Sequence, residues 1–93
     1  MRRRIAKQKR RECLRHGAII LSEGWLKWPE DGSKWYEANL YFNGWNIHAP
    51  GKDELEAYQG ALFCVESSKD EPGNAVYIPK VTEKSGLYKK HIL

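Results

Sequence analysis

The sequence predicts an α+β fold in which a small antiparallel sheet of three to four strands packs against one helix. Three observations support this fold class. Residues 35–49 alternate apolar and polar side chains around an Asn-Gly pair, residues 53–65 repeat apolar side chains at helical spacing, and residues 1–16 form a basic helix or arm. A chain of 93 residues is long enough for one domain with a small core.

The central hairpin is the best-determined element. Asn43 and Gly44 suit a two-residue type I′ turn, because both central residues of that turn need a positive φ. The turn would place one apolar face on the hairpin through the pairs Phe42–Trp45, Leu40–Ile47 and Ala38–Ala49, with Tyr36 beyond them. The opposite face would carry Trp35, Glu37, Asn39, Tyr41, Asn46 and His48. A slip of one residue would exchange the two faces, so the register is well specified.

Two elements precede the hairpin. Residues 2–16 favour a helix but contain few apolar side chains, so we expect this helix to stay frayed until it meets a partner and to end near Gly17. Residues 18–28 predict a strand with Gly24 as a candidate bulge, and a turn closes over residues 28–32.

A second helix follows Gly51. Asp53 is a suitable N-cap, and Glu56 stands three residues later, as in a capping box. Residues 61–65 at the end of this helix fit a strand as an alternative. Residues 66–74 predict an exposed loop, and residues 75–81 predict a last strand at the sheet edge, because Pro79 cannot donate to a ladder.

Charge divides the chain into three parts. Residues 1–16 hold eight basic side chains and one acid, whereas residues 17–79 hold four lysines and ten acids. We therefore separate a basic arm or helix (1–16), a compact α+β body (17–81) and a basic carboxy-terminal tail (82–93). We expect the apolar side chains of the tail to pack against the body.

The residues exclude several function classes. The sequence has no Gly-rich phosphate loop, nucleophile elbow or paired carboxylates, so we expect no enzyme and no cofactor. Cys13 and Cys64 stand far apart, and the three histidines add no metal-ligand spacing, so we expect no metal. No apolar run could span a bilayer and no signal peptide is present, which predicts a soluble cytoplasmic protein without membrane contact.

The basic arm is a candidate site for nucleic acid or for an acidic protein groove. Its cations can each neutralise a phosphate and release counterions. They are Arg2, Arg3, Arg4, Lys7, Lys9, Arg10, Arg11 and Arg15. The stretch RRRIAKQKRRE resembles the arginine-rich motifs of lambdoid phage antiterminators, which implies binding of an RNA hairpin. The alternative is a solvated tail that only aids solubility.

The body has a resemblance of its own. The segments KWYEANLYF, NG, WNI and KDELEAYQGAL resemble the three strands and helix of integrase amino-terminal and plant ethylene-response-type DNA-binding domains. The residues that carry this resemblance are Trp35, Ala38, Leu40, Trp45, Glu54, Ala57, Tyr58 and Ala61. Those domains read the major groove with Arg and Trp on the sheet.

The corresponding face of this chain is aromatic and polar but almost free of cations, which suits a protein partner. The predicted protein-binding residues are Trp25, Trp28, Trp35, Asn39, Tyr41, Asn46 and His48. Alternatively, the carboxy-terminal tail or a loop covers this face.

The small size and basic arm resemble phage-encoded modulators of host enzymes. The predicted function is therefore a non-enzymatic accessory protein that binds and modulates a host nucleic-acid-processing enzyme, such as a recombination nuclease, a polymerase or a defence complex, in the host cytoplasm. The alternative is a direct DNA- or RNA-binding protein of integrase-arm or antiterminator type. In the exposed loop, Pro72 and Gly73 are a candidate site for a prolyl isomerase.

Overall fold

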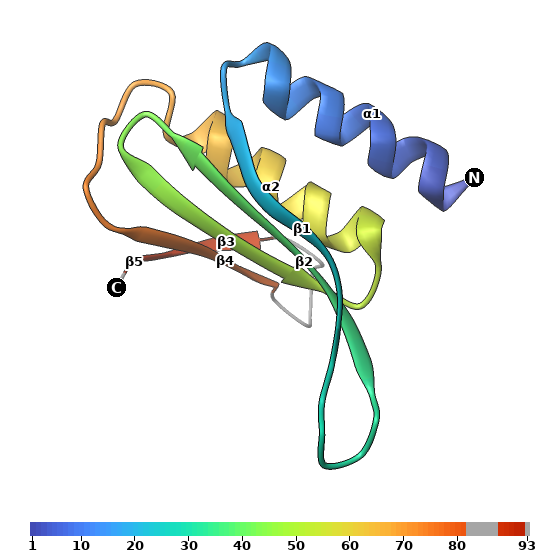
Figure 1. Cartoon of the computed structure of the whole chain (residues 1–93). Helices are drawn as coiled ribbons and strands as arrows, with labels where there is room; N and C mark the ends of the chain where they lie inside the picture. Colours follow the sequence, from blue (N-terminus) through green and yellow to red (C-terminus); the bar gives the residue numbers. More distant parts are fainter. Residues whose placement is uncertain (82–87, 93) are drawn as a thin grey trace.

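The computed structural model describes residues 1–81 and 88–92, with side chains described through residue 78. Its elements follow the order α1 (Arg2–Arg15), β1 (Ile19–Lys27), β2 (Lys34–Phe42), β3 (Trp45–Gly51), α2 (Glu54–Ser67), β4 (Val76–Val81) and β5 (Tyr88–Ile92). The strands form one sheet in the order β1-β2-β3-β4-β5 (Figure 1). The predicted α+β class is confirmed.

The sheet is mixed, whereas the sequence predicted an antiparallel one. Strands β1, β2 and β3 are antiparallel, but β4 runs parallel to β3 because α2 carries the chain back before β4 begins. The expectation that residues 75–81 form an edge strand was wrong, since β5 pairs antiparallel on the far side of β4. The pairing with β3 covers Val76 and Tyr77, so Pro79 lies past it and removes no bond there.

The hairpin has the predicted register. Phe42 pairs with Trp45, Leu40 with Ile47 and Ala38 with Ala49. The turn residues have positive φ, 50° at Asn43 and 86° at Gly44, as a type I′ turn requires. Of the predicted apolar face, Phe42 is partly buried and the other side chains are buried in the core.

Helix α2 covers the apolar face of the hairpin. The Asp53 carboxylate accepts a 2.9 Å hydrogen bond from the Glu56 backbone N–H, and the Glu56 carboxylate accepts one from the Lys52 backbone N–H. The helix continues to Ser67, so the alternative strand over residues 61–65 was wrong. Tyr58, Ala61 and Val65 are among its fully buried side chains.

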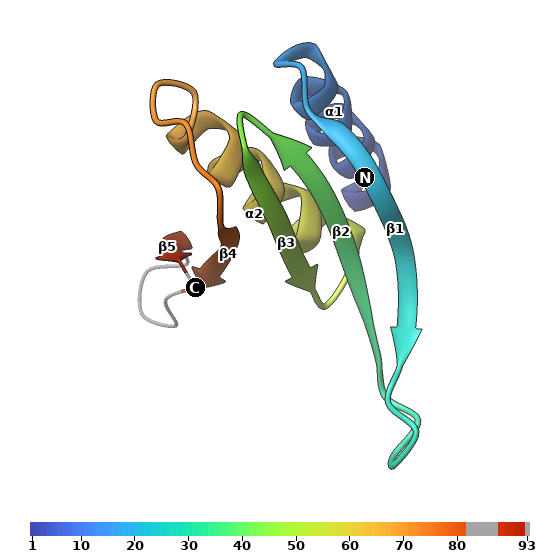
Figure 2. The ribbon, with the colours of Figure 1, turned by 60° about the vertical axis from the view of Figure 1, so that its left-hand side comes forward.

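Helix α1 is docked, which corrects the expectation of a frayed segment awaiting a partner. It packs along α2, in the same layer (Figures 1 and 2). Its contact stripe is narrow: Ala6 and Cys13 lie two turns apart and are fully buried. Because both side chains are small, the helices approach closely. Large apolar side chains do not mark this stripe, so the sequence pattern did not predict it.

Both helices lie on one side of the sheet, and α2 contacts β2, β3 and β4 from that side. The other face of the sheet, which no described helix covers, carries alternate residues of β1, β2 and β3. The register of β1 shifts between Ile20 and Ser22, so the bulge lies at Leu21 and not at Gly24. The predicted contacts of the tail side chains lie outside the described residues.

Candidate functional site

A row of cations follows the exposed side of α1. Arg4, Lys7, Arg11 and Arg15 recur every three or four residues and are exposed; we call them the cation stripe. The stripe spans about 16 Å at 1.5 Å per residue. Within the described residues, none of the four makes an ion pair, so their charges are available to an anionic partner.

The other predicted cations of α1 face the body. The Arg2 guanidinium lies 2.6 Å from the Asp53 carboxylate, and that of Arg3 lies 4.0 Å from Glu54. Arg10 donates to Glu23, while Lys9 is partly buried. The helical period therefore divides the eight predicted cations into two groups. Those on one side of α1 face the body, where the arginines pair with its acids, and those on the opposite side stay unpaired.

Arg10, Glu23 and Tyr58 form a polar cluster where α1, β1 and α2 meet. Arg10 Nε and Nη2 donate to the two Glu23 oxygens at 2.9 and 2.8 Å, and the Tyr58 hydroxyl donates to Glu23 Oε1. The hydrogen bond from Arg10 lowers the pKa of Glu23, and burial raises the pKa of Tyr58. Sequence reasoning missed this cluster, because no local pattern relates residues 13 and 35 positions apart.

The lowered pKa of Glu23 makes its contribution to stability depend on pH. The contribution is fully present above the ordinary pKa of 4.5 and is lost as the pH falls through the lower pKa of the folded state. We expect Glu23→Gln to cost about 1–3 kcal/mol at neutral pH, and the difference from wild type to shrink in acid. Urea unfolding at pH 7 and pH 3 measures both quantities, with the exposed Glu30→Gln as control. A cost that is equal at the two pH values would contradict the role of the carboxylate.

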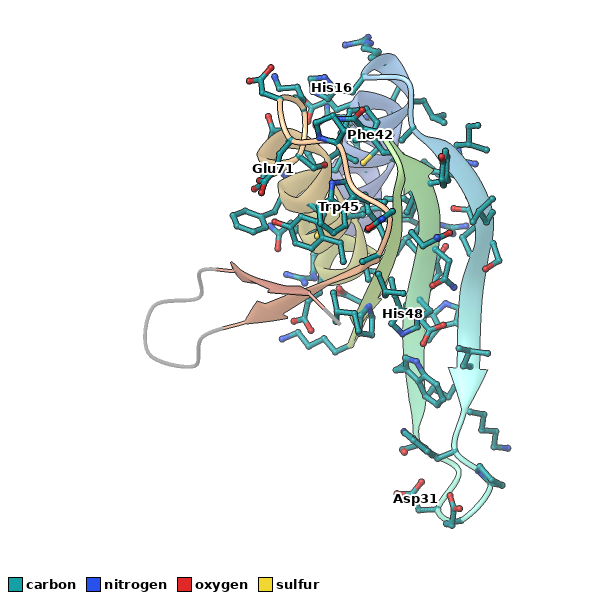
Figure 3. The ribbon with its side chains drawn as sticks, turned by 90° about the vertical axis from the view of Figure 1, so that its left-hand side faces the viewer. His16, Asp31, Phe42, Trp45, His48 and Glu71 are labelled. Carbon is teal, nitrogen blue, oxygen red and sulfur yellow. The ribbon has the colours of Figure 1, made fainter. Side chains whose placement is uncertain are left out.

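The uncovered face of the sheet holds a connected polar network. His48 Nδ1 lies 2.7 Å from Asn39 Oδ1, and His48 Nε2 lies 3.2 Å from Glu37 Oε1. The Trp35 indole N–H donates to Glu37 at 3.1 Å, and the Asn39 amide donates to Ser22 at 3.0 Å. The network spans β1, β2 and β3 and fixes the orientation of its side chains; Figure 3 shows His48.

Exposed aromatic side chains flank this network. Trp28 packs on Trp35 with 4.7 Å between ring centroids, and Trp28 and Tyr41 are 52% and 42% exposed. The aromatic face consists of Trp28, Trp35, Asn39, Tyr41, Asn46 and His48. Trp25, also predicted for it, lies on the helix side of the sheet, where its ring meets Tyr36 edge-on. By strand alternation, Leu26 belongs to the aromatic face, which the sequence prediction missed.

The loop before β4 is tied to the turn between β2 and β3. Gly73 N–H donates to the Asn43 carbonyl at 3.0 Å, and the Trp45 indole N–H donates to the Glu71 carbonyl at 2.7 Å. Figure 3 shows Trp45 and Glu71 at this end of the sheet. Pro72 is exposed, whereas Gly73 packs against the Trp45 ring, so only one residue of the predicted prolyl-isomerase site is fully accessible.

Cys13 and Cys64 are buried thiols that form no disulfide with each other, and burial raises the pKa of Cys13 to about 12. No three His, Cys, Asp or Glu side chains gather as metal ligands in the described part of the chain. Neither described helix has the length and apolar character needed to cross a bilayer. Comparison with protein-family models, curated proteins and solved structures finds no match for this chain.

Proposed function

We propose that this protein is a non-enzymatic accessory protein of a nucleic-acid-processing enzyme. The cation stripe would contact the nucleic acid, and the aromatic face would bind the enzyme. One observation carries the proposal: the unpaired cations of α1 lie on the helix layer, whereas the exposed Trp28 and Tyr41 lie on the opposite face of the sheet. Two partners could therefore bind together without competing for a surface.

The stripe suits a phosphate backbone. Each exposed Arg or Lys that neutralises a phosphate releases counterions, which favours binding at low salt. The stripe is built on a docked helix, so its cations keep a fixed spacing and direction. Acids that would compete with phosphate, namely Glu23, Asp53 and Glu54, are already paired with other arginines on the inner side of the helix.

The aromatic face suits a protein better than a nucleic acid. Its centre carries the Glu37 carboxylate, and like charge repels phosphate. Lys27 and Lys34 pair with each other across β1 and β2 on the helix side, so they add no positive charge to this face. Stacked tryptophans and an exposed tyrosine, with hydrogen-bonding groups held in place, are typical of protein interface anchors.

In this proposal the chain acts like the small phage-encoded modulators that it resembles, on a recombination nuclease, a polymerase or a defence complex of the host. The enzyme would already hold nucleic acid. Once the aromatic face binds the enzyme, the stripe is held close to that nucleic acid, so the second contact forms at a high effective concentration and strengthens the complex. The partner class follows from the two surfaces together, because either surface alone would suit a simpler binding protein.

The two surfaces can be tested separately. In the stripe variant, Arg4, Lys7 and Arg11 are changed together to Gln. This removes three charges but leaves the buried Ala6 and Cys13 in place, whereas deletion of the whole helix would expose α2. We expect this variant to reduce the salt dependence of nucleic-acid binding by a slope of about 0.9 for each lost phosphate contact. The matched control changes Lys27, Lys34 and Lys69 to Gln. Titration of labelled duplex DNA and RNA at several salt concentrations measures the slope.

The aromatic face is tested with Trp35→Ala and Tyr41→Ala. Each should weaken binding of the enzyme by about 2 kcal/mol if it fills a partner pocket, at every salt concentration. Affinity purification with and without nuclease treatment measures this, and one enzyme should remain bound after nuclease. A salt slope that the stripe variant leaves unchanged, or face variants that bind the enzyme normally, would contradict the proposal.

The alternative is direct DNA or RNA binding without a protein partner. The preformed, unpaired stripe favours this alternative as much as it favours the first proposal. Under it, nuclease treatment would remove every co-purified protein, the stripe variant would abolish binding, and the face variants would have little effect.

A further inference from the structure

Strand β1 is an edge of the sheet with unusually exposed apolar side chains. Ile19, Leu21, Trp25 and Leu26 are 57%, 59%, 56% and 42% exposed. They come from both faces of one nine-residue strand, so neither face of the edge is covered. A long apolar edge strand presents unpaired backbone groups and favours pairing with another strand.

The helix layer leaves room beside this edge. Helix α2 covers β2, β3 and β4, whereas α1 packs mainly on α2 and has few contacts with any strand. A groove therefore opens between α1 and the edge of the sheet, lined by Lys7, Arg10, Arg11, Leu14, Glu23, Tyr36 and Glu54. Figure 2 shows α1 near the start of β1, on the same side of the sheet as α2. The side chain of Leu14 is 42% exposed in this groove, although it faces the protein.

We infer that β1 pairs antiparallel with β1 of a second copy of this chain. The two sheets would then form one continuous sheet, and the groove under α1 of each copy would receive helix-side side chains from the other. This inference concerns self-association and does not depend on the function proposed above.

Over residues 21–25 the sequence of β1 is complementary to itself about Glu23, and the bulge at Leu21 ends the regular alternation there. In an antiparallel pair centred there, Leu21 lies opposite Trp25 of the second copy, and Ser22 lies opposite Gly24. Apolar side chains thus meet apolar ones twice, and the two smallest residues of the strand meet each other. The pair is isologous, as the commonest protein dimers are.

The two Glu23 carboxylates would be neighbours at the centre of this pair, which needs compensation. Each carboxylate already accepts from Arg10. Lys7 and Arg11, the two stripe cations nearest the sheet edge, also line this groove and have no ion pair among the described residues. In the dimer they can face the Glu23 of the second copy, which leaves Arg4 and Arg15 of the stripe open to nucleic acid. This charge complementarity favours a second copy over an apolar strand from an unrelated protein, which would leave these cations without an acid.

The test measures mass in the absence of any nucleic acid or protein partner. We expect sedimentation equilibrium of the full chain to show a monomer–dimer equilibrium. Leu21→Lys places a charge on the exposed edge, and the two-fold axis brings that charge into the contact twice. The dissociation constant of the dimer should therefore rise about tenfold or more. The control is Tyr41→Lys, which adds the same charge to an exposed position on β2, one strand inside the edge and on the uncovered face of the sheet.

Cross-linking locates the contact independently. A mixture of Leu21→Cys and Trp25→Cys proteins should form a mixed disulfide dimer under mild oxidation, because these positions face each other in the inferred register. The native Cys13 and Cys64 are buried and would not contribute. A monomer at every concentration would overturn the inference. So would a dimer that Tyr41→Lys disrupts while Leu21→Lys does not, or a mixture that forms no cross-link.

Discussion

Leu40→Ala is expected to destabilise the protein by about 2–5 kcal/mol. Leu40 is fully buried at the centre of the hairpin, pairs with Ile47 and lies under α2. Truncation removes its transfer free energy and leaves a cavity, which the flanking strands and helix can fill only partly. Urea unfolding followed by tryptophan fluorescence measures the loss as a lower midpoint with an unchanged slope.

The neighbouring residue provides the control. Tyr41 points to the opposite, uncovered face of the sheet, so Tyr41→Ala should cost less than about 1 kcal/mol. Equal losses at positions 40 and 41 would mean that the two faces of the hairpin are not distinguished as the register requires, and the assignment of the aromatic face would be wrong with it.

Gly73→Ala should cost about 3 kcal/mol, at the upper end of overpacking effects. A methyl group there would stand 2.1 Å from Trp45 Cε2 and 2.3 Å from Cδ2, well inside contact distance. The ring cannot give way easily, because it is buried and its N–H donates to the Glu71 carbonyl. Thermal unfolding measures the loss, and Asn74→Ala, at the exposed next residue, is the control.

A second variant separates steric overlap from a general defect of the loop. In a Trp45→Leu background the ring is gone, and Gly73→Ala should then cost much less than it does in the wild type. If the cost stays the same in both backgrounds, the contact between the loop and the ring is not its cause, and the loop is held by its backbone hydrogen bonds alone.

Local patterns predicted the parts of the fold that local chemistry determines. The Asn43-Gly44 turn fixes the register of β2 and β3, since a shift by one residue would bury Asn39 and His48. Asp53 fixes the start of α2 through its hydrogen bond to Glu56. These choices are made within a few residues, so the sequence alone specifies them.

Other features depend on residues far apart in the chain. Ala6 and Cys13 are too small to mark a helix face, and their burial depends on α2, which begins only at Glu54. The sequence predicted eight cations as one site, but Arg2, Arg3 and Arg10 are paired with acids from β1 and from the start of α2. The sequence therefore predicted which residues are the cations of α1. It did not predict which of them pair with acids of the body and which stay unpaired on the outer side.

The packing of α1 on α2 also affects the order of events during synthesis. The two helices that form the helix layer are separated by the whole three-stranded meander, so α1 leaves the ribosome well before α2 exists to receive it. Until then its inner arginines have no Asp53 or Glu54 to pair with, and all its cations are exposed to the polyanions near a translating ribosome. Arg10 gains its acid when β1 follows, and Arg2 and Arg3 gain theirs when α2 is complete. The four cations of the stripe stay unpaired among the described residues of the finished helix.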